Sequence, residues 1–422
     1  MSLLESPQAQ ALLDEGTVEA SDLSGCRARL ARFLARYLPF FYRKEQRQNA
    51  CLVVSGLLSD LERKTCEPIA RCHGVERKPI QFFVGAGKWD DEAVMGELRA
   101  DVIAQRGDPH GVLIYDGSTF PKKGRASCGV QRQWCGRLGK IENCQAAVFL
   151  AYATARGYAP LDRRLYLPED LARDAAHRRK THVPQALRYR AKWRIALELL
   201  DAHGRDVPHA WITGDDEFGR VSPFRAALRA RREFYALEVP ANTLVRDLER
   251  RPPRPRCRTG RPRRAPWQNV AAWAARQPAS RWQAFRVREG TKGPLRVLAL
   301  TVRVQTREEG KVGGEERLVV LKTQEDAPRV VYALCHAPVH TPLAELLRVL
   351  AARHQVEELF EAAKGEAGLG HYEVRSWTGW HHHVTLSLLA LWFLIQERER
   401  LGEKSAGPDR PADAFPLLPV AS

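Results

Sequence analysis

Apolar positions in the first quarter of the chain recur with the spacing of amphipathic helices. From Leu30 to Phe41 they fall every three or four residues with arginines on the opposite side, which predicts a helix interrupted near Pro39. Residues 62–87 are typical of a helix that stops at Gly74 followed by a second short helix, and residues 89–107 form another helical stretch. A small residue four positions before Gly74 fits a helix-turn-helix corner and an ordinary helical hairpin equally well.

Beyond residue 107 the pattern changes to short apolar runs separated by helical sequence. Strands are predicted at residues 112–115, 146–152 and 164–167, a helix at 184–204, and further short apolar runs at 209–219 and 233–242. Strands that alternate with helices predict an α/β core.

A basic, proline-rich segment interrupts this core. Eight arginines lie between Arg250 and Arg264, without an acid among them, so this segment cannot form a packed core. It is either a solvated loop or an arm that contacts phosphates, and we favour the arm because such dense like charge repels unless an anion neutralises it. The alternating stretches within 281–338 predict a β-rich insertion, after which residues 340–365 return to a helical pattern.

The charge balance points to a polyanionic partner. The 422 residues include 67 Lys and Arg against 50 Asp and Glu, a net charge of +17, which favours nucleic acid ahead of an anionic membrane surface. The longest apolar run, 384–395, is shorter than the roughly 20 residues that span a bilayer, and the first residues lack the features of a secretory signal. We therefore expect a cytoplasmic, nucleoid-associated protein with no membrane partner. Nine cysteines, an odd number without a CxxC pair, argue against a disulfide framework and a zinc ribbon.

Two acids follow short predicted strands. Asp116 comes directly after the run 112–115, and Asp215 ends another apolar run. If the two strands are adjacent and parallel, both carboxylates reach the edge of the sheet where ligands of open α/β folds bind. Each acid taken singly is more often a turn or cap residue.

A third acid comes from the late helix. Arg353, Glu357 and Lys364 are four and seven residues apart, so they line one helical face beside an apolar face that anchors the helix on the sheet. A solvated charged stripe with a salt bridge between Glu357 and Arg353 fits this periodicity equally well. Three converging carboxylates would repel unless cations joined them, and such oxygen ligands suit Mg²⁺ or Mn²⁺. Two such ions about 4 Å apart activate the attacking oxygen and stabilise the leaving oxygen of a phosphodiester.

Three blocks of the sequence resemble the DDE transposases of bacterial insertion sequences, whose catalytic fold is RNase H-like: residues 115–145, 212–219 and 353–386. The resemblance implies that Asp116, Asp215 and Glu357 are the three catalytic acids and metal ligands. Asp215 begins the family's Asp-x-x-aromatic-Gly pattern, and Glu357 falls in its Tyr-x2-Arg-x3-Glu-x6-Lys signature. Asp216 and Glu358 are adjacent competitors, and the register favours the first set.

Two residues depart from the family's pattern. Leu350 stands where the signature has tyrosine, so a supporting contact to the DNA end is missing or comes from elsewhere. Phe218 stands where tyrosine is commoner. Neither departure removes a metal ligand.

The resemblance implies a DNA transposase that uses two Mg²⁺ ions, with Mn²⁺ as a substitute, to cut double-stranded DNA at the element ends and join it to target DNA. A homodimer is expected because two ends must be paired. The alternatives are a catalytically inactive or domesticated sequence-specific DNA-binding protein on the same scaffold, and a host DNA nuclease. The residues expected to contact DNA phosphates are Lys122, Lys123, Arg125, Arg254, Arg256, Arg258, Arg261, Arg263, Arg264, Arg353, Lys364 and Arg375.

We expect an α/β fold in which an RNase H-like core carries two additions. The predicted units are a helical N-terminal DNA-binding region (1–107), the first part of the catalytic core (108–242), a β-rich insertion with the basic arm (243–337), the second part of the core (338–400) and a flexible tail (401–422).

Overall fold

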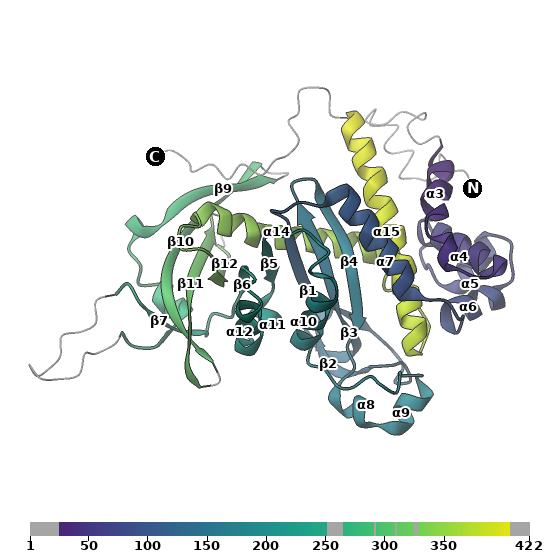
Figure 1. The fold of residues 1–422 in the computed structure, drawn as a ribbon, viewed down its shortest axis with the longest axis horizontal. Helices are drawn as coiled ribbons and strands as arrows, with labels where there is room; N and C mark the ends of the chain where they lie inside the picture. Colours follow the sequence, from purple (N-terminus) through teal and green to yellow (C-terminus); the bar gives the residue numbers. More distant parts are fainter. Residues whose placement is uncertain (1–24, 251–264, 291–292, 309, 325–327, 406–422) are drawn as a thin grey trace, which may run out of the picture.

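The computed structural model describes residues 25–250, 265–290, 293–308, 310–324 and 328–405 (Figure 1). Helices occupy the chain up to residue 106: α3 (Cys26–Ala35), the 3-10 turn η2 (Leu38–Phe40), α4 (Lys44–Leu57), α5 (Cys66–Cys72), α6 (Arg77–Gly85) and α7 (Asp91–Arg106). The break after α3 precedes the proline that was predicted to interrupt this helix. Asp90 caps α7 by accepting hydrogen bonds from the backbone N–H groups of Glu92 and Ala93.

A single mixed sheet forms the centre of the molecule. Its first strands are β1 (Val112–Pro121), β2 (Gln131–Cys135), β3 (Lys140–Thr154), β4 (Gly157–Leu165), β5 (Trp211–Gly214) and β6 (Tyr235–Glu238), with the 3-10 turn η3 (Gly136–Leu138) between β2 and β3. The antiparallel strands β1, β3 and β4 lie side by side, and β5 and β6 continue from β1 in parallel. This arrangement confirms the predicted α/β fold with an RNase H-like core.

The prediction that a strand stops just before Asp116 was wrong. β1 continues to Pro121 because its antiparallel pairing with β3 extends to Cys144. What does stop at Tyr115 is the parallel pairing with β5, whose last residue is Gly214. Asp116 therefore lies in mid-strand, but at the point where one neighbouring strand has ended.

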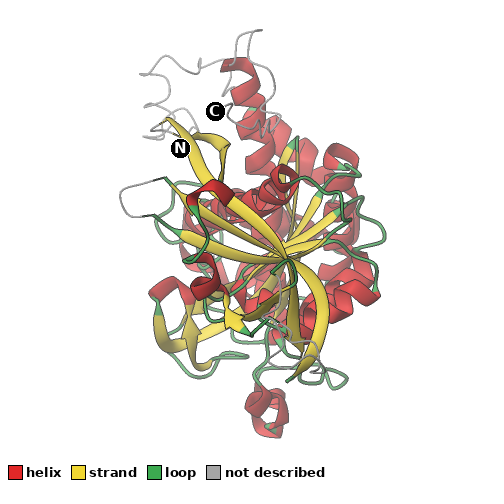
Figure 2. Cartoon of the chain, turned by 90° about the vertical axis from the view of Figure 1, so that its left-hand side faces the viewer, coloured by secondary structure: helices red, strands yellow, loops and turns green. Residues whose placement is uncertain are grey.

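The later strands extend the same sheet to twelve strands, because β12 pairs with the free edge of β6. They are β7 (Leu244–Asp247), β8 (Gln268–Asn269), β9 (Gln283–Gly290), β10 (Gly293–Glu308), β11 (Lys311–Thr323) and β12 (Val330–His336), with α13 (Val270–Ala274) and η4 (Ala279–Arg281) between them. Figure 2 shows these strands edge-on and strongly twisted. The sheet is continuous here, so the division into core and insertion stays a prediction.

Helices cover both faces of the sheet. Those between β4 and β6 are α8 (Glu169–Arg173), α9 (Ala175–Lys180), α10 (Lys192–His203), α11 (Asp216–Gly219) and α12 (Ser222–Ala230), and the last two are α14 (Leu343–Gly365) and α15 (Trp377–Ser405). Figure 1 shows α14 crossing behind the strands while α10 and α12 lie in front. Among the described residues, no helix has both the length and the apolarity needed to cross a membrane.

Candidate active site

Strand alternation sets the direction of the Asp116 side chain. Tyr115 packs against Phe224 of α12, with ring centroids 6.1 Å apart, on one face of the sheet. Asp116 is opposite Phe149 of β3, and Phe149 contacts Phe360 of α14 at 5.0 Å on the other face. Successive side chains of a strand point to opposite faces, so Asp116 lies on the face that α14 covers.

Asp215 follows β5 directly and caps the short helix α11. Its Oδ1 accepts a hydrogen bond of 3.0 Å from the backbone N–H of Glu217. The ring of Phe218 is fully buried and anchors α11 in the core. A Cβ on Gly219 would lie 1.8 Å from the carbonyl oxygen of Glu238 at the end of β6, so only glycine fits at this position. The aromatic-glycine pair of the Asp-x-x-aromatic-Gly pattern therefore holds Asp215 against the ends of β5 and β6.

Both aspartates have raised pKa values. Burial raises the pKa of Asp116 to about 7, and the nearby negative charges of Asp215 and Glu217 add to the rise. Burial and the charge of Glu217 raise the pKa of Asp215 to about 6. The cations Arg353 and Lys364 oppose the rise at Asp116. The two carboxylates thus lie close together in surroundings that disfavour their negative charge, and a bound cation would relieve this repulsion.

Arg353 of α14 lies at the centre of this cluster. Its Nε donates to Oε1 of Glu238 at 2.7 Å, and its Nη2 lies 2.8 Å from Oε1 of Glu357. His354 also contacts Glu357, with Nδ1 3.1 Å from Oε2. The Glu357 side chain remains 42% exposed. α14 therefore brings Glu357 to the cluster through Arg353, and the salt bridge that the helical spacing suggested is present.

Two functional candidates of this cluster were missed in the sequence. Glu217 adds negative charge at both aspartates, and its Oε1 pairs with Nζ of Lys192 at 2.5 Å. A Cβ on Gly117 would lie 2.3 Å from Oε2 of Glu217, so the absence of a side chain after Asp116 makes room for this fourth acid. Glu238 is the second partner of Arg353. The acid-rich run around Asp215 was a signal for Glu217, but nothing in the sequence pattern marks Glu238.

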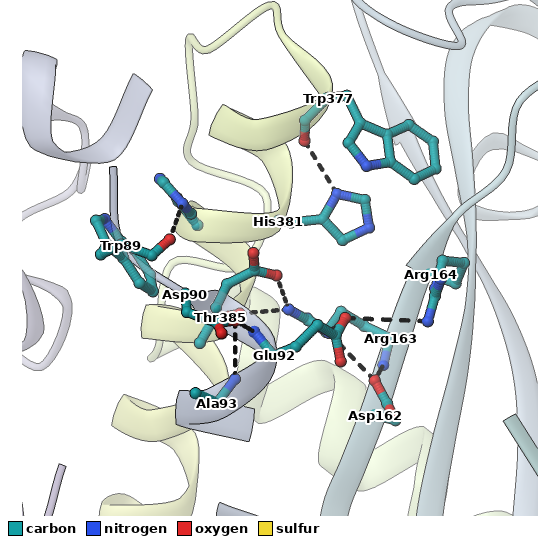
Figure 3. A network of polar contacts seen from close by, with 12 residues as sticks. Trp89, Asp90, Glu92, Ala93, Asp162, Arg163, Arg164, Trp377, His381 and Thr385 are labelled. Atoms are coloured by element: carbon teal, nitrogen blue, oxygen red, sulfur yellow. Dashed lines mark hydrogen bonds and ion pairs between the residues drawn. The ribbon is translucent and has the colours of Figure 1, made fainter. Parts of the chain in front are cut away.

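Another group of metal-ligand types lies away from this cluster. Among the described residues, the one set of three or more whose ligand atoms all lie within 4.8 Å of one another is Glu92, Asp162 and His203. Arginines already neutralise it: Arg99 lies 2.9 Å from Asp162, and the fully buried Arg163 pairs with both acids and with Thr385 of α15 (Figure 3). This network joins α7, β4 and α15, and we interpret it as structural.

The predicted phosphate-binding residues have different surroundings. Lys123, Arg125 and Arg375 are exposed. The ammonium group of Lys122 donates to the carbonyl oxygen of Tyr372 at 3.1 Å, and burial lowers its pKa to about 8. Burial also lowers the pKa of Lys364, which faces Asp116. The remaining predicted arginines lie outside the described residues: Arg254, Arg256, Arg258, Arg261, Arg263 and Arg264.

A comparison with protein families shows to which family the chain belongs. The profile of the family described as DDE superfamily endonuclease matches residues 36–294, which include β1, β5 and both aspartates. The chain belongs to this family. Members of this family use divalent metal ions.

A similar protein is the probable transposase for insertion sequence element IS701 of Microchaete diplosiphon. It is 34% identical over 118 residues, which is 27% of this chain and 30% of that relative. The chain thus matches less than a third of that transposase's length. The family assignment confirms the resemblance that the three sequence blocks indicated.

Proposed function

We propose that this DDE family member is a transposase that cuts DNA with Asp116, Asp215 and Glu357 as its catalytic acids. The observation that carries the proposal is the pair of partly buried carboxylates, one in β1 and one just after the neighbouring strand β5, with Arg353 and Glu357 of α14 beside them. Carboxylate oxygens with raised pKa values fit a divalent cation, because a cation offsets both the burial and the mutual repulsion.

Asp116, Asp215 and Glu357 would hold two Mg²⁺ ions, and Mn²⁺ would replace them. When bound, such ions polarise the scissile phosphate and lower the pKa of the attacking hydroxyl or water. The protein's own part is to position the groups: β1 and α11 fix the two aspartates, and Asp215 must be ionised to bind a cation while its Oδ1 accepts the Glu217 N–H.

The cationic side chains of α14 would orient the DNA. Arg353 now neutralises Glu238 and Glu357, and Lys364 faces Asp116. Once the acids have metal partners, both side chains would be available to phosphate oxygens on either side of the cut. Strand joining to target DNA and pairing of two ends by a homodimer follow from the same proposal.

The Glu357 contacts favour a second candidate, a DNA-binding protein that does not cut. Glu357 is paired with Arg353 and His354 and does not form a set of close ligand atoms with the two aspartates. In this candidate the salt bridge between Arg353 and Glu357 stays intact when DNA is bound, and the exposed basic side chains alone bind the DNA.

Nicking of plasmid DNA that carries the sequences flanking the gene, in Mg²⁺, decides between the two. Asp116→Asn and Asp215→Asn should remove nicking while DNA binding is retained. The matched control is Asp216→Asn: this carboxylate is 45% exposed and paired with Arg220, and its loss should leave nicking intact. Wild-type protein that binds but never nicks, or nicking that survives Asp116→Asn, would contradict the proposed chemistry.

A further inference from the structure

An exposed apolar surface occurs on the hairpin that β2 and β3 form beyond β1. Trp134 is 62% exposed, Leu138 45% and Ile141 58%. Trp134 and Ile141 are directly opposite each other across the two strands, so both point to the same face. Exposed apolar side chains that cluster in this way, with polar residues around them, mark interaction sites rather than cores.

Basic residues surround this apolar tip. Three basic residues are exposed there: Arg132, Arg137 and Lys140. Arg132 is two residues from Trp134 along β2, so both side chains point to the same face of the hairpin. The single acid of residues 131–144 is Glu142, and it lies 3.4 Å from Nζ of Lys140. Both residues are one position from Ile141 along β3, so this ion pair points away from the face that carries Trp134. The face that carries Trp134 is therefore apolar and positively charged, which fits a polyanion better than a second copy of a chain of net charge +17.

The tip lies close to the candidate active site. The backbone N–H of Arg137 donates to Oγ1 of Thr119 at 3.5 Å, and Thr119 follows Asp116 by three residues in β1. Three residues of a strand span about 10 Å. Arg137 also lowers the pKa of Lys364, the lysine that faces Asp116. The tip is thus within electrostatic reach of the residues that surround the cut.

We propose that this hairpin is a DNA-contacting element that binds the strand next to the scissile phosphate. Trp134 packs on an unpaired base there, with Ile141 and Leu138 beside it, and Arg132 and Arg137 contact phosphates. Because the backbone of Arg137 is held at Thr119, three residues along β1 from Asp116, these contacts fall close to the cut. The inference rests on the proposed function only for the position of the DNA.

Binding without catalysis tests the inference. The probe is a short duplex of arbitrary sequence with a single-stranded extension that contains 2-aminopurine, titrated with the full chain in EDTA. Trp134→Ala should weaken binding about tenfold and remove the quenching of the 2-aminopurine, because stacking of a base on an aromatic ring is lost. Trp134→Phe should restore most of both signals, whereas Trp134→Leu should not.

Two further variants separate the causes. Val339→Ala is the matched control, because Val339 is also an exposed apolar residue, at 79%. It follows β12, whose last residue pairs with the first residue of β6. Val339 therefore lies towards the end of the sheet opposite to the one that carries Asp215. This variant should bind like wild type. Arg137→Gln should reduce the slope of log Kd against log salt concentration by about one, as expected for the loss of one phosphate contact.

The outcomes distinguish this inference from the proposed function. Equal affinity and equal quenching for wild type and Trp134→Ala would overturn the hairpin contact, even if Mg²⁺-dependent nicking is found. A loss of binding in Trp134→Ala without nicking by wild type would support the contact and contradict the nuclease. A change in the sedimentation of the DNA-free protein, with DNA binding unaffected, would assign the tip to contacts between copies of the chain and refute the inference.

Discussion

Replacing Asp116 with asparagine should stabilise the metal-free protein while it removes cleavage. The pKa of Asp116 is raised from an ordinary 3.8 to about 7, so the folded state binds this proton more tightly than the unfolded chain does. At about 1.4 kcal/mol for each pH unit, the ionised carboxylate costs the folded state at most roughly 4 kcal/mol above pH 7. Asp116 is only partly buried, and solvent screening reduces this to about 2 kcal/mol.

The size of the stabilisation by Asp116→Asn should depend on pH. Below about pH 4 the carboxyl is protonated in both states and the cost is absent; it grows as pH rises towards 7 and is complete above that. Asp116→Asn should therefore raise the Tm of the EDTA-treated protein by about 2–4 °C at about pH 8 and by almost nothing at about pH 4. Differential scanning fluorimetry across this range measures the difference.

The control and the metal provide two checks. Asp206→Asn changes an exposed acid away from the cluster and should leave the Tm unchanged at every pH. Added Mg²⁺ should raise the Tm of wild type more than that of Asp116→Asn, because only wild type keeps the full ligand set. A lower Tm for Asp116→Asn at about pH 8, or a difference that does not vary with pH, would refute the argument that repulsion and burial dominate at this site.

Three more outcomes follow from the same contacts. The affinity for Mg²⁺, measured by isothermal titration calorimetry, should fall as the pH drops below about 7 and more steeply below about 6. The reason is that Asp116 and then Asp215 take up protons, which compete with the metal. An affinity that does not vary with pH would exclude both residues as ligands. Gly117→Ala should displace the flexible Glu217 carboxylate, changing the free energy of unfolding by less than about 1 kcal/mol but lowering the nicking rate; unchanged nicking would show that Glu217 has no part in the reaction. Arg163→Met should destabilise the protein by about 3–5 kcal/mol in urea unfolding, because it removes the fully buried cation that Asp91 and Asp162 share and leaves Asp162 with Arg99 as its arginine partner; a neutral effect would mean that the network is not structural.

Some features of this protein were determined by local sequence. The amphipathic spacing of the N-terminal helices appears in the structure because these helices bury an apolar stripe, such as Val53 and Leu57 of α4. In α14 the predicted apolar face around Val356 and Leu359 is also buried. The motif around Asp215 was equally readable, since the aromatic residue and the glycine act on their own short helix. The three sequence blocks were also sufficient to indicate the DDE family.

Other features depended on partners distant in the chain. β1 passes through Asp116 because β3 pairs with it as far as Cys144, and no pattern within residues 112–121 shows where a neighbouring strand will end. The pairing of Arg353 with Glu238 joins α14 to β6 across 115 positions. Likewise, the exposure of Trp134 depends on what packs around the hairpin, which its alternating sequence does not reveal.

The sequence by itself determined which residues could serve as acids, cations and helix or strand formers, because those properties belong to each side chain and its near neighbours. The tertiary structure decided which of them meet: Asp116 with Asp215 across parallel strands, and Arg353 with Glu238 between α14 and β6. The physical reason is that pairing between strands and the burial of charge are properties of the assembled sheet, and both depend on residues about a hundred positions apart.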